Sequence, residues 1–256
     1  MKEYLCDRLR VNVYPTRDEM GCAAAADIKA KILDLLQRKE NLRMIFAAAP
    51  SQNEVLAALA YDREIPWDKI HAFHMDEYIG LPASAPQAFG NFLSEHLWGL
   101  VPFKSVNYID ITAKDAVSEC ARYASLLATA PIDIVVMGIG ENGHIAFNDP
   151  PVADFSDPLA VKPVALDEVC RRQQVNDGCF ASLDDVPQTA ITLTVPTLFA
   201  GGALFCIVPA KTKAEAVKNT LTGEIGEWCP ATILRRHESA TLYLDSDSSA
   251  LWEAKT

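Results

Sequence analysis

The sequence predicts a three-layer α/β/α fold, in which helices cover both faces of a mostly parallel, Rossmann-like sheet. Short apolar runs alternate with helix-like segments along almost all of the 256 residues, as expected when helices join parallel strands. Residues 132–137 are nearly all apolar, which is typical of a parallel strand buried on both faces. No internal repeat or polar linker divides the chain, so we expect one domain over residues 1–256.

The N-terminal part predicts a helix, a strand and a second helix. Residues 16–19, Thr-Arg-Asp-Glu, match a capping box, and apolar residues follow at helical spacing. Residues 44–49 are expected to form a strand. A second capping box at residues 51–54, Ser-Gln-Asn-Glu, predicts that another helix starts directly after it. Because such a helix start presents backbone amides, Ser51 and Gln52 are candidate anion-binding residues.

In the middle of the chain, residues 70–75 are predicted to form a strand that Asp76 and Glu77 follow directly. Two carboxylates therefore stand at the carboxyl end of a parallel strand, where catalytic residues tend to lie in such sheets. The pattern then predicts a helix over residues 89–98, a strand over 106–109, a helix over 113–127 and the strand at 132–137.

In the C-terminal part, about fifteen residues beyond residue 151 have the character of a loop, since Pro158 and Pro163 lie among them. Strands are expected over residues 190–195, 204–209 and 241–244. A helix is expected from Lys211 to Leu221, and a short helix at the end of the chain.

Charge and composition exclude several classes of partner. The net charge of −11 argues against nucleic acid, whose binding depends on cations that neutralise phosphates, and it disfavours an anionic membrane surface. A few local cations can still hold a small anionic metabolite. We find no signal peptide and no apolar run of transmembrane length, so a soluble, cytoplasmic protein is expected. The seven cysteines contain no Cys-x-x-Cys pair and are expected to be buried, reduced thiols.

Residues 138–143 match the dinucleotide fingerprint Gly-x-Gly-x-x-Gly and follow a predicted strand. That fingerprint requires a helix that starts there and faces a pyrophosphate, but a Pro-Pro pair soon afterwards prevents one. We therefore interpret the turn with His144 and Asp149 as the functional signal. Gly140 and Gly143 are expected to bring the backbone and the histidine close to a ligand.

Several strand ends are expected to meet in one crevice. A carboxylate base, a histidine that titrates near neutral pH and an anion cradle are the groups needed for proton transfer on a phosphorylated sugar. In a purely structural reading, the carboxylates are turn residues and the lysine is a solvated surface charge. The residues concerned are Asp76, His144, Asp149, Ser51 and Lys213.

Two long motifs resemble those of the glucosamine-6-phosphate deaminase (isomerase) family. They are residues 75–82, Met-Asp-Glu-Tyr-Ile-Gly-Leu-Pro, and residues 138–150, Gly-Ile-Gly-Glu-Asn-Gly-His-Ile-Ala-Phe-Asn-Asp-Pro. The likeness covers most of the chain and includes residues 230–234. It implies a three-layer α/β fold and the conversion of glucosamine 6-phosphate to fructose 6-phosphate and ammonia, without a metal or an organic cofactor.

The resemblance also implies residue roles. Asp76 matches the base that moves a proton between the first two carbons of the sugar. His144 matches the residue that opens the ring, and Asp149 matches its acidic partner. Lys213 matches a phosphate ligand. Asn142 stands at a catalytic position where family members carry aspartate or asparagine.

Three departures from the family pattern concern the site. Asp149 replaces the usual glutamate, so its reach is one methylene shorter. Residues 51–54 replace a Thr-Gly-Gly-Thr-like phosphate loop, and a glutamate in that helix start is expected to repel phosphate. The family's phosphate arginine has no clear counterpart, because Arg171 and Arg172 lie several residues too early. Either these two arginines have taken over through a shifted loop, or the anionic group is smaller, displaced or absent.

Two rival functions remain on the same fold. A sugar-phosphate lactonase is a hydrolase that needs no carbon base. A sugar sensor without catalysis is the second rival, although the short N-terminus is not expected to hold a DNA-binding segment. In each case we expect a small-molecule sugar phosphate as the partner, and the sequence also allows a homo-oligomer.

Overall fold

The computed structural model describes residues 1–113, 115–176 and 178–252. Its main sheet has eight strands in the order β1-β2-β11-β10-β7-β3-β4-β6, and only the β1–β2 hairpin pairs antiparallel. The strands are β1 (Lys2–Cys6), β2 (Leu9–Val13), β3 (Leu42–Phe46), β4 (Ile70–His74), β6 (Ser105–Asn107), β7 (Ile134–Met137), β10 (Ala203–Val208) and β11 (Ala240–Leu244).

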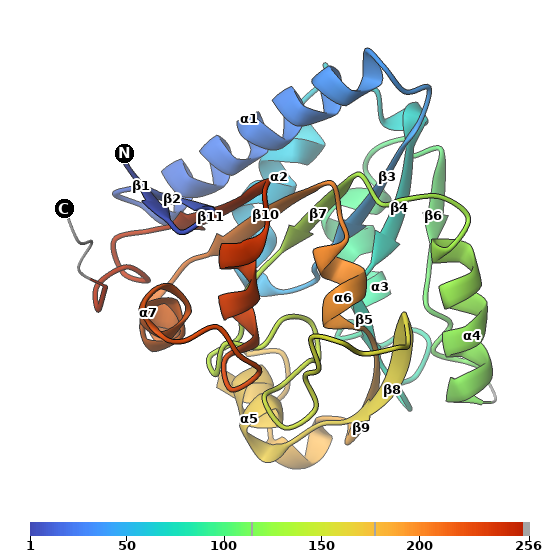
Figure 1. Ribbon diagram of the computed structural model, residues 1–256. Coiled ribbons are helices and arrows are strands. Elements are labelled where there is room, and N and C mark those ends of the chain that lie inside the picture. Colours follow the sequence, from blue (N-terminus) through green and yellow to red (C-terminus); the bar gives the residue numbers. More distant parts are fainter. Residues whose placement is uncertain (114, 177, 253–256) are drawn as a thin grey trace.

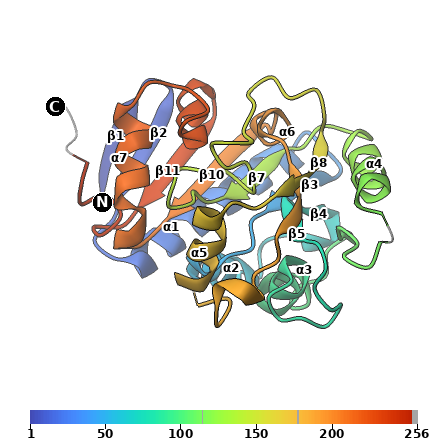
Figure 2. The ribbon, with the colours of Figure 1, turned by 90° about the horizontal axis from the view of Figure 1, so that it is seen from below.

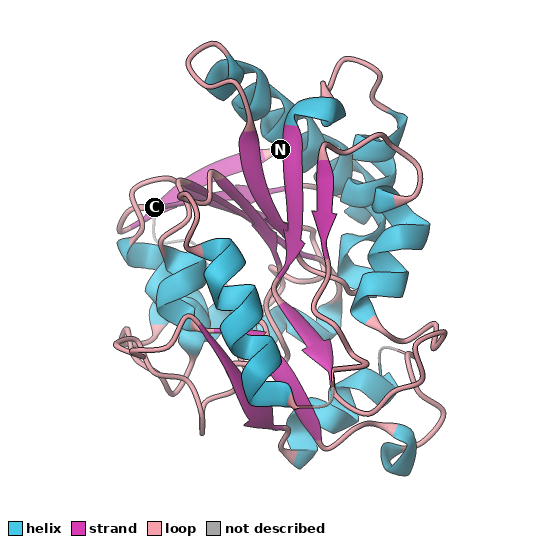
Figure 3. Ribbon diagram, turned by 90° about the vertical axis from the view of Figure 1, so that its right-hand side faces the viewer, coloured by secondary structure: helices cyan, strands magenta, loops and turns pink. Residues whose placement is uncertain are grey.

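Helices cover both faces of this sheet (Figures 1 and 3). Ile134 and Val136 of β7 belong to the core that includes α1 and α2, while Val135 and Met137 belong to the core that includes α4 and α7. The three-layer fold predicted from the sequence is thus confirmed. The helices are α1 (Arg17–Leu36), α2 (Asn53–Tyr61), α3 (Phe89–Leu93), α4 (Ala116–Leu127), α5 (Glu168–Asn176), α6 (Val195–Phe199) and α7 (Ala214–Thr222).

Most predicted elements occur with shifted ends. The first predicted helix start is confirmed with Thr16 as its N-cap, because the Thr16 side chain accepts a hydrogen bond of 3.2 Å from the Glu19 amide. The helix predicted over residues 89–98 is α3 followed by a π-helical turn, Ser94–Trp98. The predicted terminal helix is wrong for the described residues, since residues 246–251 form turns. Cys22 is exposed, contrary to the expectation that the cysteines are buried.

A second, antiparallel sheet lies beyond the carboxyl ends of the main strands (Figures 1 and 2). Its order is β5-β9-β8, with β5 (Asp76–Tyr78), β8 (Val161–Ala165) and β9 (Thr189–Leu193). The loop predicted around Pro163 is wrong at β8, because β8 is an edge strand, where proline is tolerated. This small sheet and α5 lie below the main sheet in the view of Figure 1.

None of the described helices is both long enough and apolar enough to span a membrane.

Candidate functional site

The candidate site lies at the point where the strand order of the main sheet reverses. From β3 the chain proceeds outward through β4 to β6, whereas from β7 it proceeds the other way through β10 to β11. Ligands of open α/β sheets bind at such a point, outside the carboxyl ends of the strands. A cleft is present there, and it is lined by residues that follow β3, β4 and β7, by α5 and by the start of α7.

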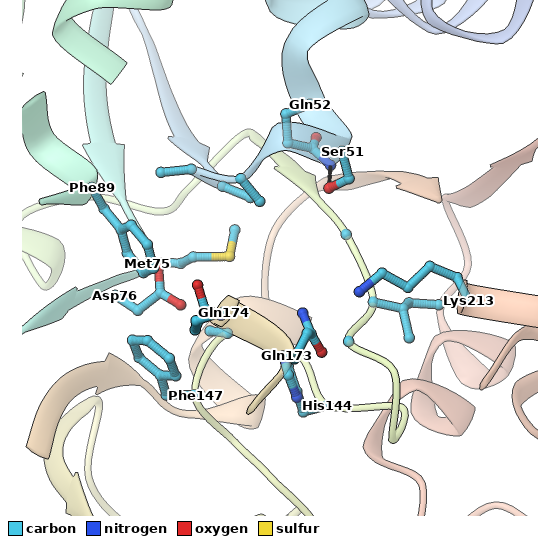
Figure 4. Close-up of a pocket in the computed structure, with 17 residues that line it drawn as sticks. Ser51, Gln52, Met75, Asp76, Phe89, His144, Phe147, Gln173, Gln174 and Lys213 are labelled. Atoms are coloured by element: carbon cyan, nitrogen blue, oxygen red, sulfur yellow. Dashed lines mark hydrogen bonds between the residues drawn. The ribbon is translucent and has the colours of Figure 1, made fainter. Parts of the chain in front are cut away.

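The cleft has two chemically different ends (Figure 4). At one end the carboxylate of Asp76 lies beside Phe89 and Phe147, whose rings stack on each other with centroids 5.6 Å apart. At the other end Lys213 extends toward Ser51. Both charged side chains are more than nine-tenths buried. The arrangement therefore separates a carboxylate in apolar surroundings from a buried cation beside a hydroxyl group.

The surroundings of Asp76 make its carboxylate a stronger base. Burial raises its pKa well above the ordinary value, and the negative charges of Glu77 and Asp149 raise it further. Glu77 is itself held by the backbone amides of Tyr78, Phe89 and Gly90, at 2.8 to 3.0 Å. Despite these bonds, burial raises the pKa of Glu77 to about 7.

His144 is fixed by two oxygen atoms on one side of its ring. Its Nδ1 lies 2.8 Å from Oδ1 of Asn142 and 2.9 Å from Oδ1 of Asp149. The Asn142 amide also donates to Asp149 at 2.8 Å, which orients its own oxygen toward the ring. Since both neighbours of Nδ1 are acceptors, the proton belongs on Nδ1, and Nε2 carries the free lone pair in the neutral ring.

The short Asp149 side chain reaches His144 without a bridging group. Burial alone would raise the pKa of Asp149. Attraction to His144 and hydrogen bonds from His144, Asn142 and Cys170 outweigh burial and lower that pKa. The carboxylate therefore stays ionised beside the imidazole, and the methylene missing relative to the family's glutamate does not separate the pair.

The two glycines predicted to contact a ligand have different positions. Gly140 lines the cleft, and a Cβ there would overlap the imidazole of His144. Gly143 does not line the cleft. It has φ +84°, and a Cβ there would overlap the sulfur of Cys229. Gly143 thus serves the turn itself, while Gly140 leaves space for the histidine ring.

The second predicted capping box is wrong. A 3₁₀ turn over Pro50–Gln52 precedes α2, and no side chain caps the helix. The side-chain amide of Gln52 donates instead to the hydroxyl of Ser51 at 3.0 Å and to the carbonyl of Ile207 at 3.2 Å. Glu54 forms an ion pair with Arg17 at 2.7 Å. The negative charge that was expected to repel phosphate is therefore offset by a partner.

The structure does not place Arg172 in the cleft. Its guanidinium is exposed and pairs with Glu168, one turn earlier in α5. Arg171 donates to backbone carbonyls of Leu183 and Val186. Two buried glutamines of α5, Gln173 and Gln174, line the cleft instead.

The contribution of α5 to the cleft was not predicted from the sequence. Cys170 and Gln173 stand three residues apart, which places them on one face of a helix, but polar residues at that spacing are not distinctive. The Gln173 side chain accepts a hydrogen bond of 2.8 Å from the backbone amide of Glu141. The helix therefore contacts the same turn that carries His144.

His144, Asp149 and Cys170 offer ligand atoms within 4.8 Å of one another, a spacing that also suits a metal ion. Metal binding by cysteine requires a thiolate. Burial and the charge of Asp149 raise the pKa of the Cys170 thiol far above its usual range. His144 and Asp149 already pair with each other at 2.9 Å, so the cluster fits a paired imidazole and carboxylate better than a metal centre.

Comparison with known proteins decides the family. Residues 15–162 match the family described as glucosamine-6-phosphate isomerases/6-phosphogluconolactonase. The chain belongs to this family. A glucosamine-6-phosphate deaminase of Bacillus cereus (strain B4264) is 34% identical over 220 residues, which are 86% of this chain and 82% of that protein.

Solved structures of the glucosamine-6-phosphate isomerase/6-phosphogluconolactonase family share the fold. A monomeric glucosamine-6-phosphate deaminase superposes with a TM-score of 0.85 at 27% identity, over 94% of this chain and 99% of that one. A 6-phosphogluconolactonase from Trypanosoma brucei superposes with a TM-score of 0.78 at 18% identity, over 95% and 98%. The second likeness concerns the fold alone.

Proposed function

We propose that the protein is an amino-sugar phosphate deaminase and isomerase, which converts a substrate like glucosamine 6-phosphate to fructose 6-phosphate and ammonia. The full-length likeness to glucosamine-6-phosphate deaminases supports this reaction. The observation that carries it in the structure is a buried carboxylate of raised pKa, Asp76, which shares one cleft with the oriented imidazole of His144.

Ring opening is assigned to His144. With the proton on Nδ1, its Nε2 can take the proton of the anomeric hydroxyl and return a proton to the ring oxygen. Ionised Asp149 stabilises the imidazolium that forms in between, as a carboxylate partner does for other catalytic histidines. The product of this step is the open aldehyde.

Isomerisation is assigned to Asp76. Its carboxylate removes the proton from C2 of the open aldehyde and delivers it to C1, which leaves an imine at C2. Water adds to that imine, and ammonia leaves. One water molecule is consumed overall. A base in apolar surroundings suits this step, because its basicity is higher than that of an exposed aspartate.

The raised pKa predicts an unusual pH dependence. Asp76 acts as a base only when ionised, so kcat/KM should fall as the pH is lowered through its raised pKa, well above the ordinary value of about 3.9. Steady-state profiles from about pH 4 to 9 test this. A Glu77→Gln variant removes a repelling charge and should move the acid limb to lower pH. Activity that stays constant down to the range of ordinary aspartates would contradict the assignment.

We assign the phosphate group to the end of the cleft with Lys213 and Ser51. A Lys213→Met variant should raise KM by roughly tenfold or more, because a charge-assisted hydrogen bond to the phosphate is lost. Lys211→Met, at an exposed position of the same turn, is the matched control and should leave KM unchanged. An unaltered KM in the Lys213 variant would place the phosphate elsewhere.

The experiment that tests the function offers phosphorylated and unphosphorylated glucosamine and galactosamine, and measures ammonia and ketose separately. Formation of both products from the phosphorylated amino sugar supports the proposal. Turnover of a sugar-phosphate lactone instead would favour the lactonase, and binding without turnover would favour the sensor. If only the unphosphorylated sugars are turned over, the substrate of this cleft, which two glutamines line, is an amino sugar without a phosphate group.

All the residues assigned to the proposed site belong to one chain, and a solved relative at 27% identity is described as monomeric. We therefore infer that catalysis does not require a homo-oligomer, which light scattering at the assay concentration tests. Cytoplasmic location stays a prediction, which cell fractionation tests.

A further inference from the structure

We propose that Gln174 is a specificity-determining residue, whose side-chain amide hydrogen-bonds the hydroxyl group on C3 of the amino sugar. The inference rests on the proposed function for the identity of that sugar. Gln174 belongs to neither of the two family motifs, which cover residues 75–82 and 138–150.

The side-chain amide of Gln174 has no partner within the protein. Gln174 lies in α5, is 8% exposed and lines the cleft. Its backbone carbonyl accepts a hydrogen bond of 2.9 Å from the Cys179 amide. Its side chain forms no hydrogen bond within the part of the chain that the structure describes. Because buried polar groups of proteins almost always have a hydrogen-bond partner, this amide requires one from outside the chain.

The preceding residue, Gln173, has a different role. It lines the same cleft, but its side chain accepts the hydrogen bond of 2.8 Å from the backbone amide of Glu141. That bond fastens α5 to the turn that carries His144. The helix is thereby fixed beside the cleft, and Gln174 is held in place while its amide can bind a ligand.

The position of Gln174 in the cleft points to one carbon of the sugar. In the view of Figure 4 its amide lies between Asp76 and Gln173, and Lys213 lies beyond Gln173. Asp76 is assigned to C1 and C2 of the open sugar, and Lys213 to the phosphate on C6. A group next to Asp76 on the side of the phosphate therefore faces the carbon that follows C2. The hydroxyl group on C3 is the partner that the substrate offers there.

The chemistry of an amide favours a hydroxyl group as the partner. An amide has both a donor and an acceptor, and a hydroxyl group can bind to either of them. A phosphate dianion only accepts hydrogen bonds and an ammonium group only donates them. Each of these charged groups would suit one atom of the amide and oppose the other.

An uncharged residue at position 174 also preserves the basicity of Asp76. Burial and the negative charges of Glu77 and Asp149 raise the pKa of Asp76. A lysine or arginine beside that carboxylate would lower its pKa and weaken the base. Glutamine can bind the substrate without this effect.

The test compares glucosamine 6-phosphate with its 3-deoxy analogue in the wild type and in Gln174→Met. Methionine has nearly the length of glutamine, and the substitution removes no hydrogen bond among the described residues, so the variant should fold. Discrimination is the ratio of the two kcat/KM values. We expect it to be roughly tenfold greater in the wild type than in Gln174→Met, because only the wild type leaves an amide unpaired when the hydroxyl is absent. The intrinsic reactivity of the analogue affects both enzymes equally and cancels in this comparison.

Two controls define the contact. Wild type and Gln174→Met should discriminate equally against a 4-deoxy analogue. Gln188→Met, at an exposed glutamine that does not line the cleft, should keep the discrimination of the wild type against the 3-deoxy analogue. Equal discrimination against the 3-deoxy analogue by wild type and Gln174→Met would overturn the proposal. A difference that arises with the 4-deoxy analogue instead would overturn the assignment to C3.

A binding measurement separates this inference from the proposed function. Reduction of C1 to an alcohol gives open-chain forms of glucosamine 6-phosphate and of its 3-deoxy analogue that cannot isomerise. Calorimetry measures their Kd whether or not the protein is a deaminase. Gln174→Met should weaken binding of the form with the C3 hydroxyl by roughly tenfold and leave binding of the 3-deoxy form unchanged. An inactive wild type with this pattern would overturn only the function, and an active wild type without it would overturn only the role of Gln174.

Discussion

Replacing Asp76 with asparagine is expected to lower kcat for deamination by about 10³-fold. Asparagine has nearly the same shape and can still lie beside Phe89 and Phe147, but it cannot accept the proton from C2. Binding at the other end of the cleft is untouched, so KM should change little. Release of ammonia from glucosamine 6-phosphate measures the loss.

The same substitution should not destabilise the fold. The pKa of Asp76 is higher in the folded protein than in the unfolded chain. The contribution of Asp76 to stability is therefore fully present below its pKa in the unfolded chain, and it is lost as the pH rises through its pKa in the folded protein. An ionised carboxylate buried in the folded protein costs free energy, and asparagine, which has no charge, avoids that cost. At neutral pH we therefore expect Asp76→Asn to have an unfolding temperature equal to or above that of the wild type.

This pairing of outcomes distinguishes a base from a structural aspartate. An exposed residue, Asp68, provides the control Asp68→Asn, which should leave both activity and unfolding temperature unchanged. If Asp76→Asn unfolds at a lower temperature and loses activity in proportion, the residue is a turn component. If it keeps full deaminase activity, another group is the base. Full activity on a lactone with no deamination would favour the lactonase.

The fold could be predicted because its signals are local and repeated. Continuous apolar runs such as residues 132–137 occur where a strand is buried on both faces, and capping at Thr16 marks a helix start. The failures have local causes as well. β8 was not predicted because it contains Pro163, and proline is excluded from a central strand but tolerated in an edge strand such as β8. Pro50 began a 3₁₀ turn, which displaced the helix start from the Ser-Gln-Asn-Glu pattern.

The candidate site was predictable where one motif carried several residues. His144, Asn142 and Asp149 lie within eight positions, and their mutual bonds of 2.8 to 2.9 Å follow from one turn. No such motif predicted that residues of α5 line the cleft. Whether Arg172 or Gln173 faces the cleft depends on the rotation of a single helix. An i,i+4 partner such as Glu168 holds the arginine at the surface.

Replacing Gly140 with alanine is expected to lower kcat by about 100-fold without unfolding the protein. A Cβ at this position would occupy the space of the His144 ring. The ring borders the cleft, so it can swing into open space instead of forcing the backbone apart. It would then leave Asn142 and Asp149, and a misplacement of about 1 Å is enough to cost a factor of this size. Steady-state kinetics with glucosamine 6-phosphate measure the loss.

The displaced ring should affect ring opening more than binding, because the phosphate is assigned to Lys213 and Ser51 and not to His144. We therefore expect a reduced kcat and a nearly constant KM. Gly226→Ala is the control, since its Cβ would meet only the half-exposed Trp228. The ¹⁵N shifts of His144 should show that the Nδ1 proton is no longer held. A Gly140→Ala enzyme with wild-type kcat would mean that ring opening does not depend on the position of this imidazole, and it would remove His144 from the proposed reaction.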